Sequence, residues 1–505
     1  MPHAQGARGL CEDAGRAVTS TAGARSIIVA SNRGPVSFAE DERGQLVPRR
    51  GKGGLVTAIG AALQSSGGLW IASAMSDADH RHAGRTIHVD ADRESYRFRM
   101  LPFDPQEYGR FYDGISNRVL WFLHHHLWDL PRRPTFEGLA LDWAAYRAVN
   151  EEFARALDEE GPPSGPPPVF LVQDYHLALV PAILRGRRPD APIAHFSHIP
   201  FAGPNEFRIL PQSIREELLG GLLGADVVGF QAPRWAENFL LCCRTLPGAR
   251  VDLWRSLVRW QGRRVRVRIY PVSIDPAALT EDASTEPVAR ARDEIARMKG
   301  DRRLLLRVDR AELSKNILRG LLAYERFLLD HQEWAGRVSF LALLNPSRQH
   351  LPEYRAYAQE CVALAERING DLGRPGWKPI ELSLQDDYAR ALAAYQLYDV
   401  LVVNPVYDGM NLVAKEGPVL NGQDGALVLS ENAGAFAELG PWAVPVNPFD
   451  VEASAEAILA ALTMDPAERG RRARDLRKAV SRNRIDRWVA VQVRDLERVR
   501  PPEDS

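Results

Sequence analysis

The chain has 505 residues, enough for two or three domains with large cores. Hydrophobic residues make up 45% and charged residues 26%, the balance of an ordinary soluble globular protein. A formal net charge of −1 argues against bulk nucleic-acid binding, and four cysteines are too few for a disulfide framework. The cysteines show no metal-binding spacing, no apolar run reaches membrane-spanning length, and the first residues lack the apolar core of a signal peptide. These features predict a cytoplasmic protein without a membrane contact.

Along the chain, residues 1–25 are polar and small and predict a disordered lead. Short β-branched runs then alternate with helical stretches. The first series of predicted strands is 26–30, 169–172, 193–196, 226–230 and 265–270. After a proline-containing junction at 270–279, the second series is 303–308, 338–344, 380–384, 400–403, 426–429 and 443–446.

Two such series predict two doubly wound α/β domains that face each other across a cleft, with ligands at the carboxyl ends of the strands. The expected boundaries are 26–271 for the first domain and 272–490 for the second, followed by a tail at 491–505. The last helix of the second domain is a candidate for returning to the first.

Polar side chains follow the strands of the first series. Arg33, in SNRGPV, comes directly after the first strand. It is suited to bind an anionic ligand there, and the alternative is an ordinary surface arginine. The glycine-rich segment 51–54 precedes an apolar helix, so it suits either a phosphate or a tight turn. Asp174 in QDYHL and His198 in SHIPF follow two neighbouring strands, with helix capping and a structural histidine as the alternatives.

Cations follow the strands of the second series. Arg310 and Lys315 lie in RAELSKN, and Arg348 lies in NPSR. Arg310 and Lys315 at one sheet edge suit a diphosphate, whereas the alternative is a pair of weak surface ion pairs with Asp309 and Glu312. Arg348 as a third cation at the same edge makes that alternative harder to sustain.

The segment YDGMNLVAKE is the most specific. Asp408 stands at a turn, Asn411 begins a predicted helix, and Glu416 follows Asp408 by about two helical turns. The two carboxylates suit hydroxyl groups of a sugar and a ribose, and the alternative is an N-cap on a solvated helix.

Taken together and in this order, SNRGPV, GKGGL, QDYHL, SHIPF, DGMNLVAKE, LVLSENAGA and VNPFD resemble the trehalose-6-phosphate synthase family, over roughly residues 26–490. These are retaining glycosyltransferases of the glycosyltransferase-B fold. The resemblance implies transfer of glucose from a nucleotide-glucose to glucose-6-phosphate, giving α,α-trehalose-6-phosphate. It implies no cofactor and no metal for the chemistry, and it leaves a homo-oligomer open.

The resemblance also implies roles for individual residues. The side chains expected to hold glucose-6-phosphate are Arg33, Tyr112, Trp121 and Arg348, and Asp174 is expected to touch the acceptor sugar. The residues expected to hold the donor are Gly53, Gly54, His198, Arg310, Lys315, Asp408, Gly409, Met410, Asn411, Leu412 and Glu416. Among these, His198 is assigned to the 6-hydroxyl region, Asp408 to the sugar hydroxyls and Glu416 to the ribose. The residues expected to act in catalysis are Arg310, Lys315, Asp174, His198 and Asp408.

Three departures from the family's pattern stand out. The family's RLDYSKG loop reads RAELSKN here, so Glu312, Leu313 and Asn316 replace Asp, Tyr and Gly. Tyr407 stands where an arginine is frequent, and Trp70 is not followed by a second tryptophan. The first two lie in the donor-binding domain, and with a resemblance to actinobacterial members they favour GDP-glucose over UDP-glucose, with ADP-glucose third.

Two other functions remain open. One is a pseudo-glycosyl transfer that couples a nucleotide-activated cyclitol to a sugar phosphate or aminocyclitol phosphate. The other is a silent family member that binds sugar phosphate and regulates a partner. The retained Arg310 and Lys315 argue against the silent member, because only catalysis needs cations for a leaving group.

Overall fold

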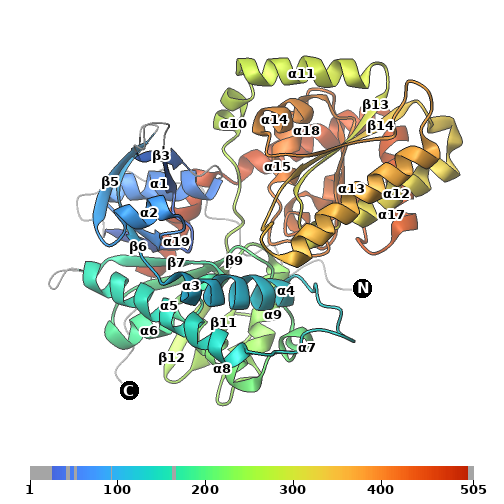
Figure 1. The fold of residues 1–505 in the computed structure, drawn as a ribbon. Coiled ribbons are helices and arrows are strands. Elements are labelled where there is room, and N and C mark those ends of the chain that lie inside the picture. The colour runs from blue at the N-terminus through green and yellow to red at the C-terminus, as the bar shows by residue number, and fades with distance from the viewer. Residues whose placement is uncertain (1–25, 41–45, 51–53, 92–93, 162–166, 499–505) are drawn as a thin grey trace.

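The computed structural model describes all residues except 1–25, 41–45, 51–53, 92–93, 162–166 and 499–505. The expected disordered lead, Cys11 and Gly53 therefore lie outside the described residues. The described chain forms two α/β units (Figure 1), each built on a largely parallel sheet. This confirms the predicted fold class.

The first sheet has the strand order β10-β11-β12-β9-β8-β7-β1-β4-β6-β5. Its strands are β1 (Ile27–Ala30), β4 (Leu69–Ser73), β5 (Thr86–Ala91), β6 (Glu94–Leu101), β7 (Val169–Gln173), β8 (Ile193–Ser197), β9 (Val227–Phe230), β10 (Arg250–Asp252), β11 (Leu257–Trp260) and β12 (Arg263–Ile269). Seven neighbours from β12 to β6 run parallel, and antiparallel strands close both ends. A separate hairpin joins β2 (Val36–Glu40) to β3 (Leu46–Arg50).

The central strands are mostly apolar, as expected where helices cover both faces of the sheet. Every residue of β7 and β8 is buried. The helices of this unit are α1 (Gly54–Ser66), α2 (Asp77–His82), α3 (Pro105–Gly109), η1 (Arg110–Leu120), α4 (Trp121–His124), α5 (Leu139–Glu160), η2 (Tyr175–Leu177), α6 (Val180–Arg187), α7 (Pro204–Phe207), α8 (Gln212–Leu222) and α9 (Pro233–Cys243).

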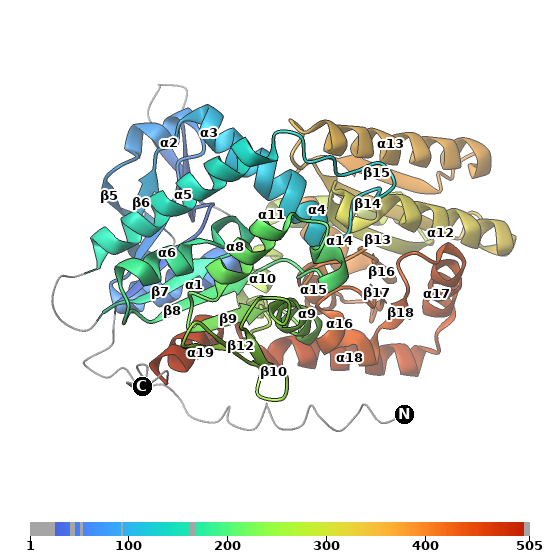
Figure 2. The ribbon, with the colours of Figure 1, turned by 90° about the horizontal axis from the view of Figure 1, so that it is seen from below.

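The second sheet is entirely parallel, in the order β15-β14-β13-β16-β17-β18. Its strands are β13 (Arg303–Arg310), β14 (Val338–Asn345), β15 (Ile380–Leu384), β16 (Val400–Val403), β17 (Ala426–Ser430) and β18 (Val444–Val446). Its helices are α10 (Pro276–Asp282), α11 (Glu286–Lys299), η3 (Leu313–Lys315), α12 (Ile317–Asp330), η4 (Gln332–Trp334), α13 (Pro352–Leu372), α14 (Tyr388–Leu397), α15 (Val413–Leu420), α16 (Phe436–Leu439), η5 (Gly440–Trp442), α17 (Val451–Thr463) and α18 (Pro466–Arg482). In Figure 2, α13 lies above these strands and α18 lies below them.

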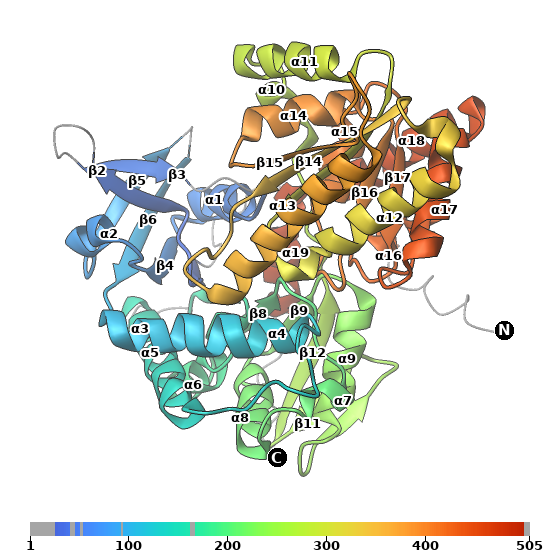
Figure 3. The same ribbon diagram turned by 45° about the vertical axis from the view of Figure 1, so that its right-hand side comes forward.

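The last helix, α19 (Ile485–Glu497), packs on the first unit, although α18 before it packs on the second (Figure 3). It lies against α1 and β8. The Trp488 indole donates to the carbonyl of Tyr270 at 2.9 Å, and the Tyr270 hydroxyl donates to Asp495 at 2.7 Å. Because α19 reaches Glu497, the tail predicted from residue 491 begins too early.

Between the units, β12 ends at Ile269 and α10 begins at Pro276, so the predicted junction is the connecting segment. Most predicted strands match observed ones to within about two residues. The predictions missed β10 and β11, which are short, and β2 to β6 before the second predicted strand. Among the described helices, none combines the length and the apolar character needed to cross a bilayer.

Candidate functional site

The carboxyl edges of the two sheets meet through side-chain contacts. The Arg348 guanidinium, after β14, lies 4.1 Å from the centroid of the Trp121 ring at the start of α4. The Arg310 guanidinium, at the end of β13, lies 5.8 Å from the same centroid. Two predicted cations of the second unit therefore face a predicted acceptor residue of the first. Cation–π contacts of this kind favour the pairing of the two edges.

On the first unit, Arg33 and Tyr112 form a second cluster. Arg33 follows β1, is exposed, and donates to the Tyr112 hydroxyl at 2.9 Å. The Tyr112 ring stacks on His176, whose pKa burial lowers well below the usual value. Two residues far apart in sequence are thus joined at one point of the sheet edge.

Glu312 connects the two cations of the second unit. Its carboxylate accepts from Arg310 at 2.9 Å, from Arg348 at 3.1 Å and from the Ser347 hydroxyl at 2.6 Å. Burial alone would raise the pKa of this fully buried carboxyl, but the charges of Arg310 and Arg348 outweigh it and hold the pKa at about 2. The alternative of weak surface ion pairs is wrong for Glu312. Asp309 is also buried, and it pairs with Arg307 at 2.9 Å.

Lys315 donates to the Asp408 carboxylate at 2.5 Å, and the Asn411 side-chain amide donates to the same oxygen at 3.1 Å. Burial opposes ionisation of Asp408, yet Lys315 lowers the pKa of this carboxyl below its usual value. The helix predicted from Asn411 begins at Val413, and Asn411 itself has a φ of 72°. Asp408 thus serves an ion pair rather than a helix cap.

The loop that carries Asp408 packs backbone to backbone against residues 432–435. The N–H of Gly434 donates to the carbonyl of Asp408 at 3.0 Å, and the N–H of Ala435 donates to that of Met410 at 2.8 Å. A Cβ on Gly409 would come 1.9 Å from the carbonyl oxygen of His198 in the other unit. Glycine is therefore required where DGMN meets SHIPF.

Asp174 has an unusual backbone at the end of β7, with φ 73° and ψ 167°. Its side chain does not cap the helix that follows, contrary to that alternative, but accepts from the backbone N–H of His198 at 3.1 Å. Burial raises the pKa of Asp174 to about 6, although that N–H bond opposes the shift.

His198 lies between two glutamine side chains. Its Nε2 is 3.0 Å from Gln173 Oε1 and its Nδ1 is 3.4 Å from Gln231 Nε2. Burial lowers the pKa of His198 to about 3. The ring is therefore neutral, with Nε2 donating and Nδ1 accepting, and it does not act as a cation.

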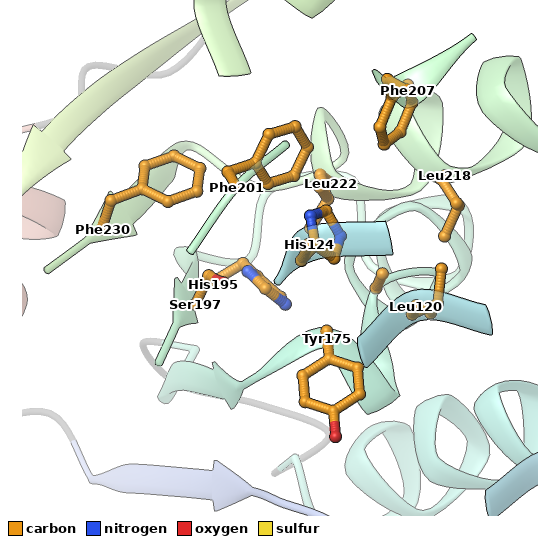
Figure 4. A pocket seen from close by; sticks show the side chains of 11 residues that line it. Leu120, His124, Tyr175, His195, Ser197, Phe201, Phe207, Leu218, Leu222 and Phe230 are labelled. Atoms are coloured by element: carbon orange, nitrogen blue, oxygen red, sulfur yellow. The ribbon is translucent and has the colours of Figure 1, made fainter. Parts of the chain in front are cut away.

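Behind Asp174 lies a small enclosed cavity, shown in Figure 4. His195 and His124 reach into it, and most of its other lining is apolar. The His195 Nε2 lies 3.1 Å from the carbonyl oxygen of Asp174, and burial lowers the pKa of His195 to about 4. None of the predicted site residues that the structure describes is among the residues that line this cavity.

The remaining predicted donor residues lie nearby in the second unit or at α1. Glu416 in α15 accepts from the Tyr395 hydroxyl at 3.1 Å, and burial raises its pKa. Met410 is buried and Leu412 is half-buried. Gly54 begins α1, while Gly53 lies outside the described residues. No group of three or more potential metal-ligating side chains occurs within the described ranges.

Sequence reasoning missed several residues that hold the two units together. The Trp235 indole donates to the carbonyl of Gly409 at 3.1 Å, and Arg234 donates to the Asn432 side chain at 2.7 Å. Tyr407, one of the noted departures, stacks on His126 at 4.2 Å and lies beside Arg234. Arg234 and Trp235 lie in the first turn of α9, shortly after β9 ends, and His126 follows α4. They follow a strand as the predicted site residues do, but no motif in the sequence distinguished them from ordinary helix residues.

With this geometry in hand, comparison with known proteins is informative. The model of glycosyltransferase family 20 matches residues 25–498. The chain belongs to this family. Membership confirms the predicted resemblance and the predicted class of enzyme, a retaining glycosyltransferase.

Curated relatives include a trehalose-6-phosphate synthase of Mycobacterium avium, 36% identical over 93% of this chain and 95% of the relative. A validamine 7-phosphate valienyltransferase of Streptomyces hygroscopicus is 32% identical over 92% of this chain and 93% of the relative. A bifunctional trehalose-6-phosphate synthase/phosphatase of Thermoproteus tenax is 34% identical, and the chain spans only 62% of its length.

Solved structures of similar proteins share the whole fold. An E. coli structure bound with UDP-2-fluoro glucose has a TM-score of 0.81 at 28% identity and covers 94% of this chain and 100% of its own. An α,α-trehalose-phosphate synthase of Burkholderia xenovorans in complex with glucose-6-phosphate has a TM-score of 0.80 at 29% identity, with the same coverage of both chains.

Proposed function

We propose that the protein transfers glucose from a nucleotide-glucose to glucose-6-phosphate and forms α,α-trehalose-6-phosphate with retention of configuration. The observation that carries the proposal is the contact of Arg310 and Arg348 with Trp121 across the two sheet edges. It brings Arg310, which suits a diphosphate, next to Arg348 and Trp121, which suit a sugar phosphate. Relatives named for this reaction, at up to 36% identity over nearly the full chain, support it.

On the acceptor side, we assign Arg33 and Arg348 to the phosphate of glucose-6-phosphate. Arg33 is exposed, and its hydrogen bond to Tyr112 fixes its direction. Guanidinium groups suit this role because they bind phosphate with two parallel hydrogen bonds. Trp121 supplies an apolar wall, and Asp174 is assigned to a hydroxyl of the acceptor sugar.

On the donor side, Arg310 and Lys315 are assigned to the diphosphate, and Asp408 with the backbone of residues 409–412 to the glucose. Lys315 is paired with Asp408 at 2.5 Å. A donor diphosphate would draw the Lys315 charge toward itself and leave the Asp408 oxygens for sugar hydroxyls. The amino end of α1 at Gly54 suits a phosphate of the donor. Neutral His198 suits the 6-hydroxyl region of the donor glucose, and Glu416 suits the ribose of the nucleotide.

The proposed chemistry needs no covalent intermediate on the protein. The acceptor hydroxyl attacks the anomeric carbon as the bond to the diphosphate breaks, and a phosphate oxygen of the leaving group takes the hydroxyl proton. The cations stabilise the charge that develops on that group, and contact between the two units aligns the reactants and excludes water. In this proposal Arg310 and Lys315 supply the positive charge, and no metal or other cofactor is assigned.

The identity of the base in the donor nucleotide is a separate proposal. Asn316 has a φ of 58°, a conformation that both glycine and asparagine tolerate, and Glu312 keeps a carboxylate between the cations. Tyr407 lies at the contact between the units. These departures therefore have structural explanations and do not point to a base. The preference for GDP-glucose over UDP-glucose and ADP-glucose now rests on the resemblance to actinobacterial members alone.

One assay tests these proposals. The purified chain is given glucose-6-phosphate with GDP-, UDP- or ADP-glucose, and the product and its anomeric configuration are identified by NMR. We expect α,α-trehalose-6-phosphate, with kcat/KM highest for GDP-glucose. A higher value for UDP-glucose would reverse the base preference but keep the reaction.

A second candidate function is the pseudo-glycosyl transfer, favoured by the 32% identity to a validamine 7-phosphate valienyltransferase. The same assay with a nucleotide-activated cyclitol distinguishes it. Coupling of the cyclitol without turnover of any nucleotide-glucose would refute our main proposal, and turnover of neither donor would favour a silent regulator. A cytoplasmic location suits the phosphorylated substrates, and assembly into a homo-oligomer stays a prediction.

A further inference from the structure

An arginine-lined hollow lies at the opposite edge of the first sheet from the candidate site. Its lining includes Pro192 just before β8 and Asp226 just before β9, which are the amino ends of parallel strands. The candidate site lies at the carboxyl ends of the same sheet. Figures 1 and 3 show the β11–β12 hairpin on the side of the first unit away from the second. The hollow is therefore separate from the proposed reaction centre.

The arginines of this hollow form an ordered array on the hairpin. Arg250, Arg259 and Arg264 are paired across β10, β11 and β12, so they stand in one row. Arg264, Arg266 and Arg268 alternate along β12, so they stand in one column on the same face. The inward residues of β12, Val265 and Val267, are buried in the core. Strand alternation thus directs five guanidinium groups to one side.

Few negative charges balance this array. Eight arginines and two aspartates line the hollow, a formal excess of six positive charges. Asp226 is already bound by Arg185 and Arg263, each at 2.7 Å. Outside the lining, Asp495 pairs with Arg268 and Asp252 pairs with Arg255, each at 3.6 Å. Within the described ranges, no carboxylate lies at ion-pair distance from the other four arginines of the array, Arg250, Arg259, Arg264 and Arg266. Like charges directly opposite on neighbouring strands are destabilising, so this arrangement opposes folding unless an anion joins it.

We propose that this hollow binds a compact anion that carries several phosphate groups. Arginine forks bind phosphate oxygens with two parallel hydrogen bonds, and the rows and columns of the array present several such forks together. The hollow has a volume of about 1090 Å³, slightly above the usual range for small-molecule sites, so it can hold a ligand with several phosphate groups. A net charge of −1 for the whole chain leaves the rest of the surface acidic, which disfavours a long nucleic acid extending beyond the hollow.

Binding of inorganic tripolyphosphate to the full chain, measured by isothermal titration calorimetry, tests the proposal. The double variant Arg259→Gln, Arg264→Gln removes two forks from the centre of the array. The matched control Arg132→Gln, Arg290→Gln removes two exposed arginines elsewhere, so both variants have the same net charge. A thermal melt checks that each variant is folded.

We expect the affinity for tripolyphosphate to fall by roughly tenfold for each fork removed from the hollow, the scale of one charge-assisted contact. The control should bind within about twofold of the wild type, and kcat of both variants should be unchanged. Equal affinities for the array variant and the wild type would refute the site, as would an equal loss in the control.

A single-stranded oligonucleotide of about 16 nucleotides serves as the extended competitor. Tighter binding of the oligonucleotide than of tripolyphosphate would refute a compact ligand. The proposal does not depend on the proposed glucosyl transfer, because its readout is binding and its variants lie away from the reaction centre.

Discussion

His195 donates from Nε2 to the carbonyl oxygen of Asp174 at 3.1 Å, because a carbonyl can only accept. Asp174 has φ 73° and ψ 167°, a backbone region that residues with side chains rarely occupy and that costs about 1–3 kcal/mol. The N–H of Asp174 is also held, by the carbonyl of Phe196 at 2.6 Å. Strain at this position persists because neighbouring groups fix it, and His195 is a positioning residue for Asp174.

Replacing His195 with Phe should therefore disturb the site without touching the substrates. The loss of the hydrogen bond lets the Asp174 backbone move, so we expect kcat for glucosyl transfer to fall by roughly tenfold or more. It also leaves the Asp174 carbonyl without this donor, so the free energy of unfolding should fall by about 1–3 kcal/mol. His195→Gln keeps an N–H donor and should retain most of the activity. The acid limb of the pH–rate profile, which we assign to Asp174, should shift in the Phe variant alone. An unshifted limb in that variant would leave His195 a purely structural residue.

Asp174→Asn should make the protein more stable above neutral pH while it impairs transfer. Burial raises the pKa of Asp174 to about 6, against about 4 in the unfolded chain, so the folded state holds the proton more tightly. The wild type therefore loses stability relative to the variant as pH rises from about 4 to about 6. At about pH 8 the difference in unfolding free energy should be about 1–3 kcal/mol, measured by denaturant titration. A difference that does not change with pH would contradict the raised pKa.

Arg310→Ala and Lys315→Ala should separate activity from stability. Both should lower kcat by roughly 100-fold, the effect of losing one preorganised charge donor. The Arg310 side chain is 49% exposed, and without it the buried Glu312 carboxylate still binds Arg348 and Ser347, so its loss should cost about 1 kcal/mol or less. Lys315 is 12% exposed, and its loss leaves the Asp408 carboxylate buried without its cation, which should cost about 2–4 kcal/mol. Equal melting temperatures for the two variants would contradict the ion pair, and near-native kcat in both would refute the proposed role of the loop.

Glu312→Gln tests the carboxylate between the cations. The folded-state pKa of about 2 lies below the unfolded value of about 4.3, so Glu312 contributes stability that is present above about pH 4.5 and lost as pH falls to about 2. We expect the variant to be less stable than the wild type by about 2–4 kcal/mol at pH 7 and the difference to vanish near pH 2. Chemical unfolding across this range measures it. A constant difference would mean that Glu312 acts through packing and not through charge.

The strands that position the site were predictable because they are continuous apolar runs between helices. β7 and β8 are buried on both faces, and their mostly apolar sequences indicate this burial without tertiary information. The β10 and β11 strands carry arginines on one face and are only three and four residues long, so their pattern resembles a surface loop. Short polar strands are stabilised by pairing with a neighbour, which a window of sequence does not show.

In the candidate site, the residue types at strand ends predicted the cations Arg310, Lys315 and Arg348. They did not predict which carboxylates pair with these cations. One alternative left Glu312 in a surface ion pair, because sequence does not show that Arg348, 36 residues later, returns to it. Nothing in the sequence singled out Lys415, yet it is fully buried and bonds to Glu438 and to the carbonyl of Val272. Contacts of this kind depend on how two sheets meet, which follows from tertiary structure and not from local pattern.

Arg33 provides the sharpest test of the acceptor side. It is exposed at the end of β1, and the Tyr112 hydroxyl at 2.9 Å fixes its direction. If it binds the phosphate of glucose-6-phosphate, Arg33→Ala should raise KM for that substrate by roughly 10- to 100-fold, the scale of lost charge-assisted bonds. KM for the nucleotide-glucose should change by less than about threefold, and the preference for glucose-6-phosphate over free glucose should narrow.

Tyr112→Phe, which removes only the hydroxyl, should also raise KM for glucose-6-phosphate, but by a smaller factor. Steady-state kinetics with each substrate varied in turn measures both constants, and an unchanged acceptor KM in Arg33→Ala would remove Arg33 from the phosphate site.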